Sequence, residues 1–254
     1  MQSKVNDNIQ IIIDPGHGGS ETGAVANGYK EKDLNLTVSL ELRKILQGYF
    51  SKVLMTRETD VYFDLNERAA WMAQKAAVFS GRTIGLSIHE NAFNGQARGT
   101  EVIYSVHSTT DLSKCITDKI AELGVPRRNP NMYTKSSSKG ADIDYFGIIR
   151  NSGKAQIVII ESLFIDNASD AQFLKQADFL KNLARKIAEG LLEYLKIPQE
   201  QSKPETPKQH WAKADNDELM KDGILLSDHT STLDNPATEG FVLSMLNRIR
   251  KDNK

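Results

Sequence analysis

The chain contains 254 residues with a formal net charge of −1 at pH 7, and 39% of them are hydrophobic, which is enough to form a packed core. This near-zero charge gives no electrostatic reason to expect nucleic acid or an anionic membrane as a partner, so we predict neither. The single cysteine, Cys115, excludes an internal disulfide, and its helical setting predicts a small buried side chain without chemistry.

The first residues, MQSKVNDNIQ, lack a basic segment followed by an apolar one, and no apolar run approaches the roughly 18 residues that a membrane span needs. We therefore expect the chain to be synthesised in the cytoplasm as a soluble protein without a signal peptide. Export by other proteins or lysis of the cell can still bring it elsewhere, so its place of action stays open.

Strands and helices are predicted to alternate along the first three quarters of the chain. Apolar runs predict strands at 9–14, 51–57, 83–89, 100–106 and 155–162. Apolar residues at helical spacing predict helices at 34–46, 64–76, 112–123 and 173–195. This alternation, with nearly continuous apolar strands, predicts an α/β domain at 1–197 with a mostly parallel twisted sheet flanked by helices.

Three of these helices have recognisable start signals. Asp33 is the expected N-cap of the first helix. The pairs Asp64 with Glu67 and Ser169 with Gln172 have the spacing of capping boxes, in which each side chain accepts a backbone N–H of the other residue. We expect both pairs to begin helices.

A composition change follows this domain. The segment PQEQSKPETPKQ, residues 198–209, is rich in proline, polar and charged residues, and is predicted to be a linker. The remaining residues, 210–254, are predicted to form a small, mainly helical module. A unit of this size is marginally stable alone and would gain from pairing with a second copy or docking on the first domain.

Groups of catalytic type stand where the predicted strands end. His17 follows the first strand, His89 closes the third and Glu161 closes the fifth, while Glu31 lies on a loop before the first helix. Ligand sites of open α/β sheets gather at the carboxyl ends of the strands. Two histidines and one carboxylate with an open fourth position have the composition of a catalytic zinc site, and the second carboxylate is then free to act on bound water.

The turn around His17 needs separate consideration, because a glycine-rich turn after a strand can also bind phosphate. The glycines of IIIDPGHGGSETGA fit neither the P-loop spacing nor the Rossmann spacing. They allow positive φ and close backbone approach, which would aim the imidazole inward. The other histidines, His107, His210 and His229, are expected to be surface or structural residues. Glu161 follows four apolar residues, where a carboxylate is costly to bury without a partner or metal.

Five blocks of the sequence carry a family resemblance. They are IIIDPGHGG, KEKDLNL, VLMTRETD, LSIHENA and GIIRNSGKAQIVIIESLFIDNASD, spread over roughly residues 9–195. In order and spacing they resemble the signature blocks of the zinc-dependent N-acetylmuramoyl-L-alanine amidase family, sometimes called amidase type 3. The resemblance implies that His17, Glu31 and His89 bind Zn²⁺ and that Glu161 is catalytic. It also implies that the substrate is peptidoglycan, cleaved at the amide between N-acetylmuramic acid and L-alanine.

Other polar residues near these blocks are open to two interpretations. Glu90 departs from the small or neutral residue common in relatives, and Phe93 excludes an H-E-x-x-H motif, so Glu90 is expected to point away from His89. The polar segment 127–150 is predicted to be a long loop at the rim of the substrate site. Arg150 is a candidate for a peptide carboxylate or for a salt bridge within that loop, and Asn91 is a candidate for contacting substrate.

Two other functions compete with amidase activity: zinc endopeptidase activity on the stem peptide, and non-catalytic cell-wall binding. Retention of all four candidate residues disfavours the second. The tail segments HWAKADNDELMKDGILL and PATEGFVLSMLNRIRK weakly resemble one S-layer-homology unit, which implies wall-polymer binding, although a dimerisation helix pair explains the apolar positions almost as well. A phage endolysin and a bacterial autolysin, acting on the wall after release or lysis, both suit the chain.

Overall fold

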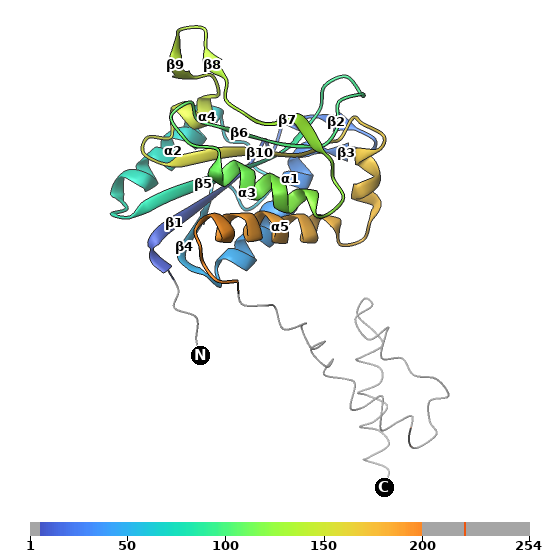
Figure 1. The fold of residues 1–254 in the computed structure, drawn as a ribbon, viewed down its shortest axis with the longest axis horizontal. Coiled ribbons are helices and arrows are strands. Elements are labelled where there is room, and N and C mark those ends of the chain that lie inside the picture. Colours follow the sequence, from blue (N-terminus) through green and yellow to red (C-terminus); the bar gives the residue numbers. More distant parts are fainter. Residues whose placement is uncertain (1–5, 200–220, 222–254) are drawn as a thin grey trace. The chain divides into compact units, whose positions relative to one another are not determined.

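A computed structural model of the chain describes residues 6–199 and residue 221 (Figure 1). Its centre is one six-stranded sheet in the order β4-β1-β5-β10-β6-β7. The strands are β1 (Asn6–Pro15), β4 (Phe50–Met55), β5 (Arg82–Asn91), β6 (Thr100–Tyr104), β7 (Arg127–Tyr133) and β10 (Gln156–Phe164). The first four strands in the sheet order are parallel, β6 runs antiparallel to β10, and β7 is parallel to β6. The predicted α/β fold class is confirmed.

Helices cover both faces of this sheet, as Figure 1 shows. The helices are α1 (Glu31–Leu46), α2 (Leu65–Val78), α3 (Asp111–Ala121), α4 (Gly147–Arg150) and α5 (Phe179–Tyr194). The side chains of β1 alternate between the faces: Ile11 and Ile13 belong to the cluster formed with α1, α3 and α5, whereas Ile12 belongs to the cluster that contains Met72 of α2. Because both faces are covered, the strand is apolar at every position from Ile11 to Ile13.

Short elements complete the described part of the chain. Two small antiparallel hairpins pair β2 (Val25–Ala26) with β3 (Tyr29–Lys30) and β8 (Ser136–Ser137) with β9 (Gly140–Asp144). The second hairpin projects from the top of the view in Figure 1. It lies within residues 127–150, which were predicted to be a loop. That prediction was wrong, because the polar residues of this segment form an edge strand, β7, as well as a hairpin and α4.

The start signals of the helices have different outcomes. The capping box of Asp64 and Glu67 is confirmed at α2. Asp33 is not an N-cap, because α1 already begins at Glu31: the first-turn N–H groups of Glu31 and Lys32 donate to the carbonyls of Ala24 and Thr22. Tertiary contacts thus replace a side-chain cap, and they place Glu31 at a helix start rather than on a loop.

The long helix predicted after Ser169 is interrupted. A 3-10 helix occupies Asp170–Lys175, and α5 begins only at Phe179. Ser169 makes no capping hydrogen bond; the side chain of Asn167 instead accepts the N–H groups of Ser169 and Asp170 at 2.9 and 3.2 Å. The predicted capping box of Ser169 was therefore wrong, because Asn167 accepts the N–H of Ser169 and the backbone carbonyl of Ser169 accepts the N–H of Gln172 at 3.3 Å.

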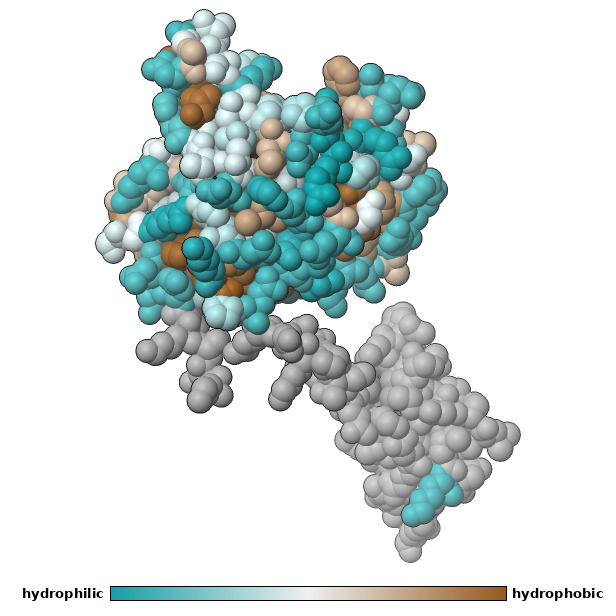
Figure 2. Space-filling model, in the orientation of Figure 1, coloured by the Kyte–Doolittle hydropathy of each residue, from teal (hydrophilic) through white to brown (hydrophobic). Residues whose placement is uncertain are grey.

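The surface in the view of Figure 2 is mostly hydrophilic, with scattered hydrophobic residues. Among the described residues, no helix has the length and apolarity to cross a membrane. Cys115 is half-buried rather than buried as predicted, and desolvation raises the pKa of its thiol, which disfavours the nucleophilic thiolate.

The chain divides into two units, residues 1–198 and 199–254. The predicted linker at 198–209 lies almost entirely outside the described residues, and so does the predicted module at 210–254, apart from residue 221. Both remain predictions.

Candidate metal centre and active site

The carboxyl ends of three neighbouring strands bring the candidate residues together. In the register of the sheet, Asp14 of β1 lies beside Ser87 of β5, and His89 of β5 lies beside Glu161 of β10. His17 follows β1 within two residues. A parallel sheet aligns the ends of its strands, so residues far apart in sequence meet at one edge. Glu31 joins them from the first turn of α1.

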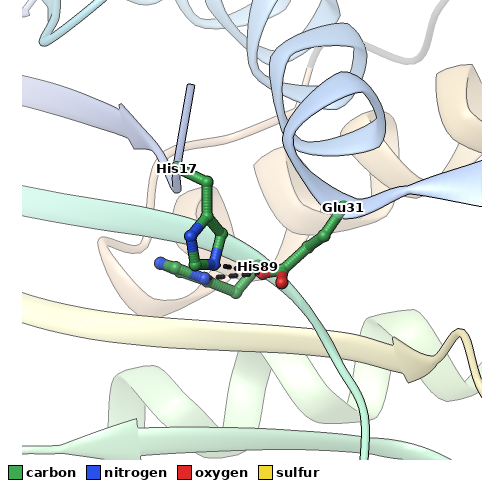
Figure 3. Close-up of side chains that lie close together, drawn as sticks. All are labelled: His17, Glu31 and His89. Atoms are coloured by element: carbon green, nitrogen blue, oxygen red, sulfur yellow. Dashed lines mark hydrogen bonds and ion pairs between the residues drawn. The ribbon is translucent and has the colours of Figure 1, made fainter. Parts of the chain in front are cut away.

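Figure 3 shows the side chains of His17, Glu31 and His89 pointing toward one another. Nε2 of His17 lies 3.0 Å from Oε1 of Glu31, and Nδ1 of His89 lies 2.8 Å from the same oxygen. One candidate ligand atom from each residue falls within 4.8 Å of the others. The three residues predicted to bind zinc therefore form one cluster.

The backbone around this cluster is adapted to close approach. His17 itself has φ of 60°, a conformation that few non-glycine residues adopt and that is concentrated at functional sites. Gly16 allows the ring of His89 to lie against the backbone, because a Cβ built on Gly16 would be 2.2 Å from Cε1 of His89. A Cβ on Gly23 would be 2.4 Å from Oε2 of Glu31. The glycines therefore make room for the ligand side chains themselves.

Replacing Gly16 with alanine is expected to displace His89 and to lower metal affinity by at least tenfold, a loss of the size seen when residues that orient ligands are changed. The alanine variant of Gly48, whose added Cβ would meet its nearest neighbour at 3.3 Å, is the matched control. Competition against a coloured chelator measures the affinity, and circular dichroism checks the fold. Unchanged zinc affinity in a folded Gly16→Ala protein would contradict this role of the glycine.

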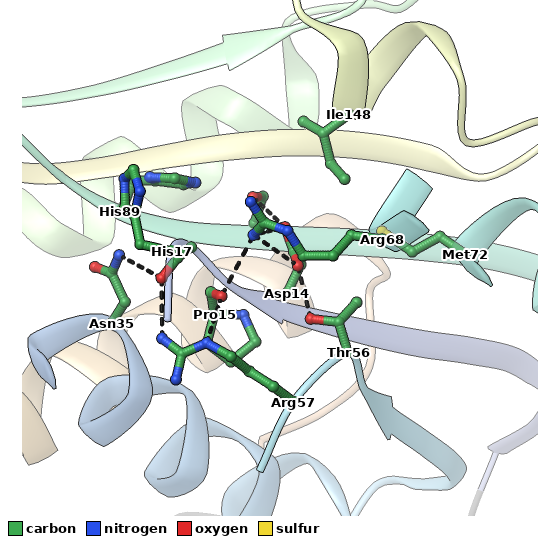
Figure 4. A network of polar contacts seen from close by, with 12 residues as sticks. Asp14, Pro15, His17, Asn35, Thr56, Arg57, Arg68, Met72, His89 and Ile148 are labelled. Carbon is green, nitrogen blue, oxygen red and sulfur yellow. Dashed lines mark hydrogen bonds and ion pairs between the residues drawn. The ribbon is translucent and has the colours of Figure 1, made fainter. Parts of the chain in front are cut away.

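A buried arginine holds the turn that carries His17. Arg57 donates from Nε to the carbonyl of Pro15 at 3.1 Å (Figure 4). Its Nη2 donates to the carbonyls of Gly16 and Lys32, both at 2.9 Å. It therefore ties the turn after β1 to the start of α1, where Glu31 lies. No role was predicted for Arg57; the available signal was a charged residue at the end of the apolar run 51–57.

A second buried arginine reaches the site from the other face of the sheet. Nη1 of Arg68, on α2, lies 3.3 Å from Oδ1 of Asp14 (Figure 4). The same oxygen accepts a hydrogen bond from the hydroxyl of Thr56 at 2.6 Å, and Oδ2 of Asp14 accepts one from the hydroxyl of Ser87 at 2.8 Å. Burial alone would raise the pKa of Asp14, but Arg68 and the two hydroxyls outweigh it and lower that pKa. Asp14 is therefore a stable anion at the edge of the site.

Charge within the cluster is balanced in the same way. Burial alone would raise the pKa of Glu31, but the hydrogen bonds and charges of His17 and His89 hold it well below the usual range. Burial would lower the pKa of His89, but the hydrogen bond to Glu31 raises it. The N–H of Ala24 also donates to Oε2 of Glu31 at 2.9 Å. Glu31 is thus an anion at neutral pH, as a metal ligand must be.

Glu161 faces the same pocket as the cluster but has different electrostatics. The pocket has a volume of about 240 Å³ and is lined by Asp14, His17, Glu21, Leu65, Arg68, Ser87, His89, Phe146, Gly147, Ile148, Ile159 and Glu161. Desolvation is the main cause that raises the pKa of Glu161 to about 7, with His89 opposing it and Glu31 adding to it. A carboxyl poised near neutrality suits a group that accepts and returns a proton.

Glu90 lies beside this site without lining the pocket. Its side chain is 1% exposed, and Oε2 accepts the N–H of Leu163 at 3.1 Å, on the side of the strand expected for a neighbour of His89. Its backbone N–H donates to Oε1 of Glu31 at 3.3 Å. Desolvation raises the pKa of Glu90 well above its usual range, and the nearby Glu31 and Glu161 add to this shift.

Neither of the two predicted substrate contacts, Arg150 and Asn91, lines the pocket of His17, His89 and Glu161, and their contact with substrate stays a prediction. Arg150 donates to the carbonyls of Asp144 and Tyr145 at 2.7 and 2.8 Å, and it lines a different pocket together with His107. It therefore holds its own segment, by hydrogen bonds to carbonyls rather than by the salt bridge considered above. The amide of Asn91 donates to Glu101 at 2.7 Å. His107 is exposed as expected, and His210 and His229 lie outside the described residues.

The donor set fits a zinc ion. Two imidazole nitrogens and one carboxylate oxygen within 4.8 Å of one another, with a pocket on their open side, match the three protein ligands of catalytic zinc sites. Nδ1 of His17 is buried without hydrogen-bond geometry to any described group, although Oε1 of Glu21 lies 3.1 Å away. The short distances from both imidazoles to one oxygen of Glu31 leave an ion room only if the side chains part slightly.

Comparisons with known proteins agree with this site. The family model described as N-acetylmuramoyl-L-alanine amidase matches residues 11–193. The endolysin of Bacillus phage SPP1 is 33% identical over 209 residues, which cover 78% of this chain and 73% of the endolysin. The N-acetylmuramoyl-L-alanine amidase LytC of Bacillus subtilis is 32% identical over 185 residues, covering 72% of this chain but only 35% of LytC.

A solved structure has the same fold. The catalytic domain of CwlV, an N-acetylmuramoyl-L-alanine amidase from Bacillus (Paenibacillus) polymyxa, superposes with a TM-score of 0.62 at 26% identity and covers 75% of this chain and 99% of that domain. The family match extends from β1, which leads to His17, to the end of α5, and includes Glu31, His89 and Glu161. The chain belongs to the N-acetylmuramoyl-L-alanine amidase family.

Proposed function

We propose that this enzyme, a peptidoglycan amidase by family, cleaves the bond between N-acetylmuramic acid and L-alanine with a zinc ion held by His17, Glu31 and His89. The observation that carries the proposal is that Glu161 lines the same pocket as His17 and His89. A metal cluster and a separate carboxyl of raised pKa in one pocket are the two parts that amide hydrolysis requires.

Zn²⁺ bound there would supply Lewis-acid chemistry, lowering the pKa of a water from about 15.7 toward about 7 and polarising a carbonyl. Glu161 accepts a proton from the attacking water and returns it to the nitrogen of the departing L-alanine. The C–N bond of the amide breaks, and the products are a lactyl carboxylate on the glycan and a free amine on the peptide. Arg57 and the turn it holds keep His17 in place during the reaction.

A digest of purified peptidoglycan tests this function directly. Zinc-loaded protein is expected to release free N-terminal alanine without new reducing sugar, and chelated protein is expected to release neither. A zinc endopeptidase would expose a different amine. A protein that binds zinc and wall material yet releases no amine would be a wall-binding protein. Release of a different amine, or of no amine, would overturn the proposal.

The activity is expected to depend on pH through Glu161. Its carboxylate form is the proton acceptor, and desolvation raises its pKa to about 7, so kcat/KM should fall as the pH decreases through this value. A bound cation would lower the pKa, so the acidic limb is expected at about 7 or below. The measurement is kcat/KM from pH 4 to 9 in zinc-saturated enzyme. A flat profile across this range would contradict the assigned role.

We also propose that the enzyme acts on the cell wall after release from the cell that made it or after lysis. Similarity to a phage endolysin and to a bacterial amidase supports both settings. The C-terminal residues, 210–254, are proposed to bind a secondary wall polymer or a second copy of the chain. Sedimentation with purified walls and light scattering of the full chain separate these two partners, and absence of both would contradict a binding role.

A further inference from the structure

A second pocket adjoins the active site. Its volume is about 340 Å³, within the range of small-molecule sites, and it is lined by Thr56, Phe63, Glu67, Arg68 and Trp71. Arg68 also lines the pocket of His17, His89 and Glu161, so one side chain forms a shared wall between the two. None of the proposed catalytic groups faces the second pocket.

Arg68 has hydrogen-bonding capacity left in this position. Its side chain is 6% exposed and its charge is paired with Asp14 through Nη1. Nε is buried and has no hydrogen-bond partner among the described residues. A guanidinium offers five N–H donors, and a buried donor without an acceptor is unfavourable. An oxygen of a bound molecule at the shared wall would remove this cost.

The other side chains of the second pocket suit a sugar ring. Phe63 and Trp71 supply flat apolar surfaces, and Phe63 is 40% exposed. Glu67 and the hydroxyl oxygen of Thr56, whose proton is donated to Asp14, supply acceptors close to these rings. A small number of polar groups beside aromatic rings is a lining that matches a pyranose, because this ring presents apolar C–H faces and has hydroxyls at its rim. The oxygen of an acetamido group could accept a hydrogen bond from Nε of Arg68, which has no acceptor among the described residues.

We propose that this pocket binds an N-acetylated sugar of the glycan strand, with the sugar ring against Phe63 and Trp71 and its acetamido oxygen near Arg68. The inference rests on the proposed function, because the scissile amide joins a sugar to a peptide. A sugar held on one side of Arg68 places the bond in the neighbouring pocket, beside Glu161. Binding of the glycan strand thereby positions the substrate for hydrolysis.

Intrinsic fluorescence of Trp71 tests the proposal without turnover. The chain has two tryptophans, so Trp211→Phe leaves Trp71 as the only reporter. A peptide-free oligomer of N-acetylglucosamine is the probe, and it is expected to change the fluorescence with saturation. Phe63→Ala should weaken this binding by roughly fivefold or more, as loss of a central aromatic contact does. Phe93→Ala, a 72% exposed phenylalanine in the segment after β5, is the control and should bind as the parent protein does.

Kinetics on peptidoglycan provide a second readout. Phe63→Ala should raise KM several-fold with little change in kcat, because the phenylalanine contacts the strand and not the reacting bond. No response of Trp71 to the oligomer, or equal binding by Phe63→Ala, would overturn the proposal. So would a response to the free stem peptide alone. An inactive protein that still binds the oligomer would leave this inference intact and overturn only the amidase mechanism.

Discussion

Replacing Glu161 with glutamine is expected to lower kcat by roughly 10²–10⁴-fold, the contribution of a positioned acid–base group, while the protein keeps its zinc and its fold. The amide has nearly the same shape as the carboxyl but cannot accept the proton of the attacking water. Release of alanine amine from peptidoglycan measures the loss, and the bound metal is quantified separately. Near-normal turnover by the Glu161→Gln enzyme would contradict the role of Glu161 as the acid–base group.

The same substitution, which lowers activity, is expected to leave the stability of the fold unchanged or to increase it. Desolvation raises the folded-state pKa of Glu161 to about 7, above its unfolded value of about 4.3. The protonated carboxyl therefore contributes to the free energy of unfolding. This contribution is fully present below the pKa of the unfolded state and is lost as the pH rises through the folded-state pKa of about 7. At pH 8 without metal, Glu161→Gln should therefore melt at the same temperature as the parent or higher. Glu58→Gln, an exposed carboxylate paired with Arg43, is the matched control for both measurements.

Replacing His17 with asparagine is expected to abolish zinc binding and activity without unfolding the protein. Asparagine tolerates the φ of 60° found at this position better than most residues do, so the backbone strain is not a confounding factor. Zinc at about 100 times its Kd should stabilise the parent by about 2.7 kcal/mol, or raise Tm by roughly 5–10 °C for a domain of this size. The variant should lose this shift.

The control for this prediction is His107→Asn, because His107 is exposed and lies outside the metal cluster. Differential scanning calorimetry with zinc and with chelator measures Tm, and a metal assay after dialysis gives the stoichiometry. One bound zinc and an unchanged zinc-dependent rise of Tm in His17→Asn would show that the ion is held elsewhere. A matching loss in His107→Asn would show that the assay reports surface histidines.

Local patterns in the sequence predicted most of the strands of the sheet and most of the candidate site residues. Continuous apolar runs such as Ile11 to Ile13 indicated strands buried on both faces, because each face needs its own apolar partner. The pair Asp64 and Glu67 indicated a helix start, because the two side chains satisfy backbone donors within one turn. His17 and His89 stood out as groups of catalytic type at strand ends, and Glu161 as a charge after an apolar run.

Contacts beyond the reach of local patterns decided what those patterns left open. The start of α1 at Glu31 depends on carbonyls of Thr22 and Ala24, and a local cap rule applied to Asp33 does not include them. The segment 127–150 was too polar to predict a strand, yet pairing with β6 makes part of it one, since backbone hydrogen bonds do not require apolar side chains.

The surroundings of the candidate ligands were also decided by the tertiary structure. Arg57 and Arg68 became site residues only because folding places their guanidiniums against the turn of His17 and against Asp14. The sequence alone identifies candidate catalytic side chains, because the strand ends and turns that carry them are local features. Which charges neutralise one another, and which pocket they face, depends on contacts between separate elements. Arg57 and Gly16 are 41 residues apart, and Arg68 and Asp14 are 54 residues apart, so no local propensity encodes these contacts.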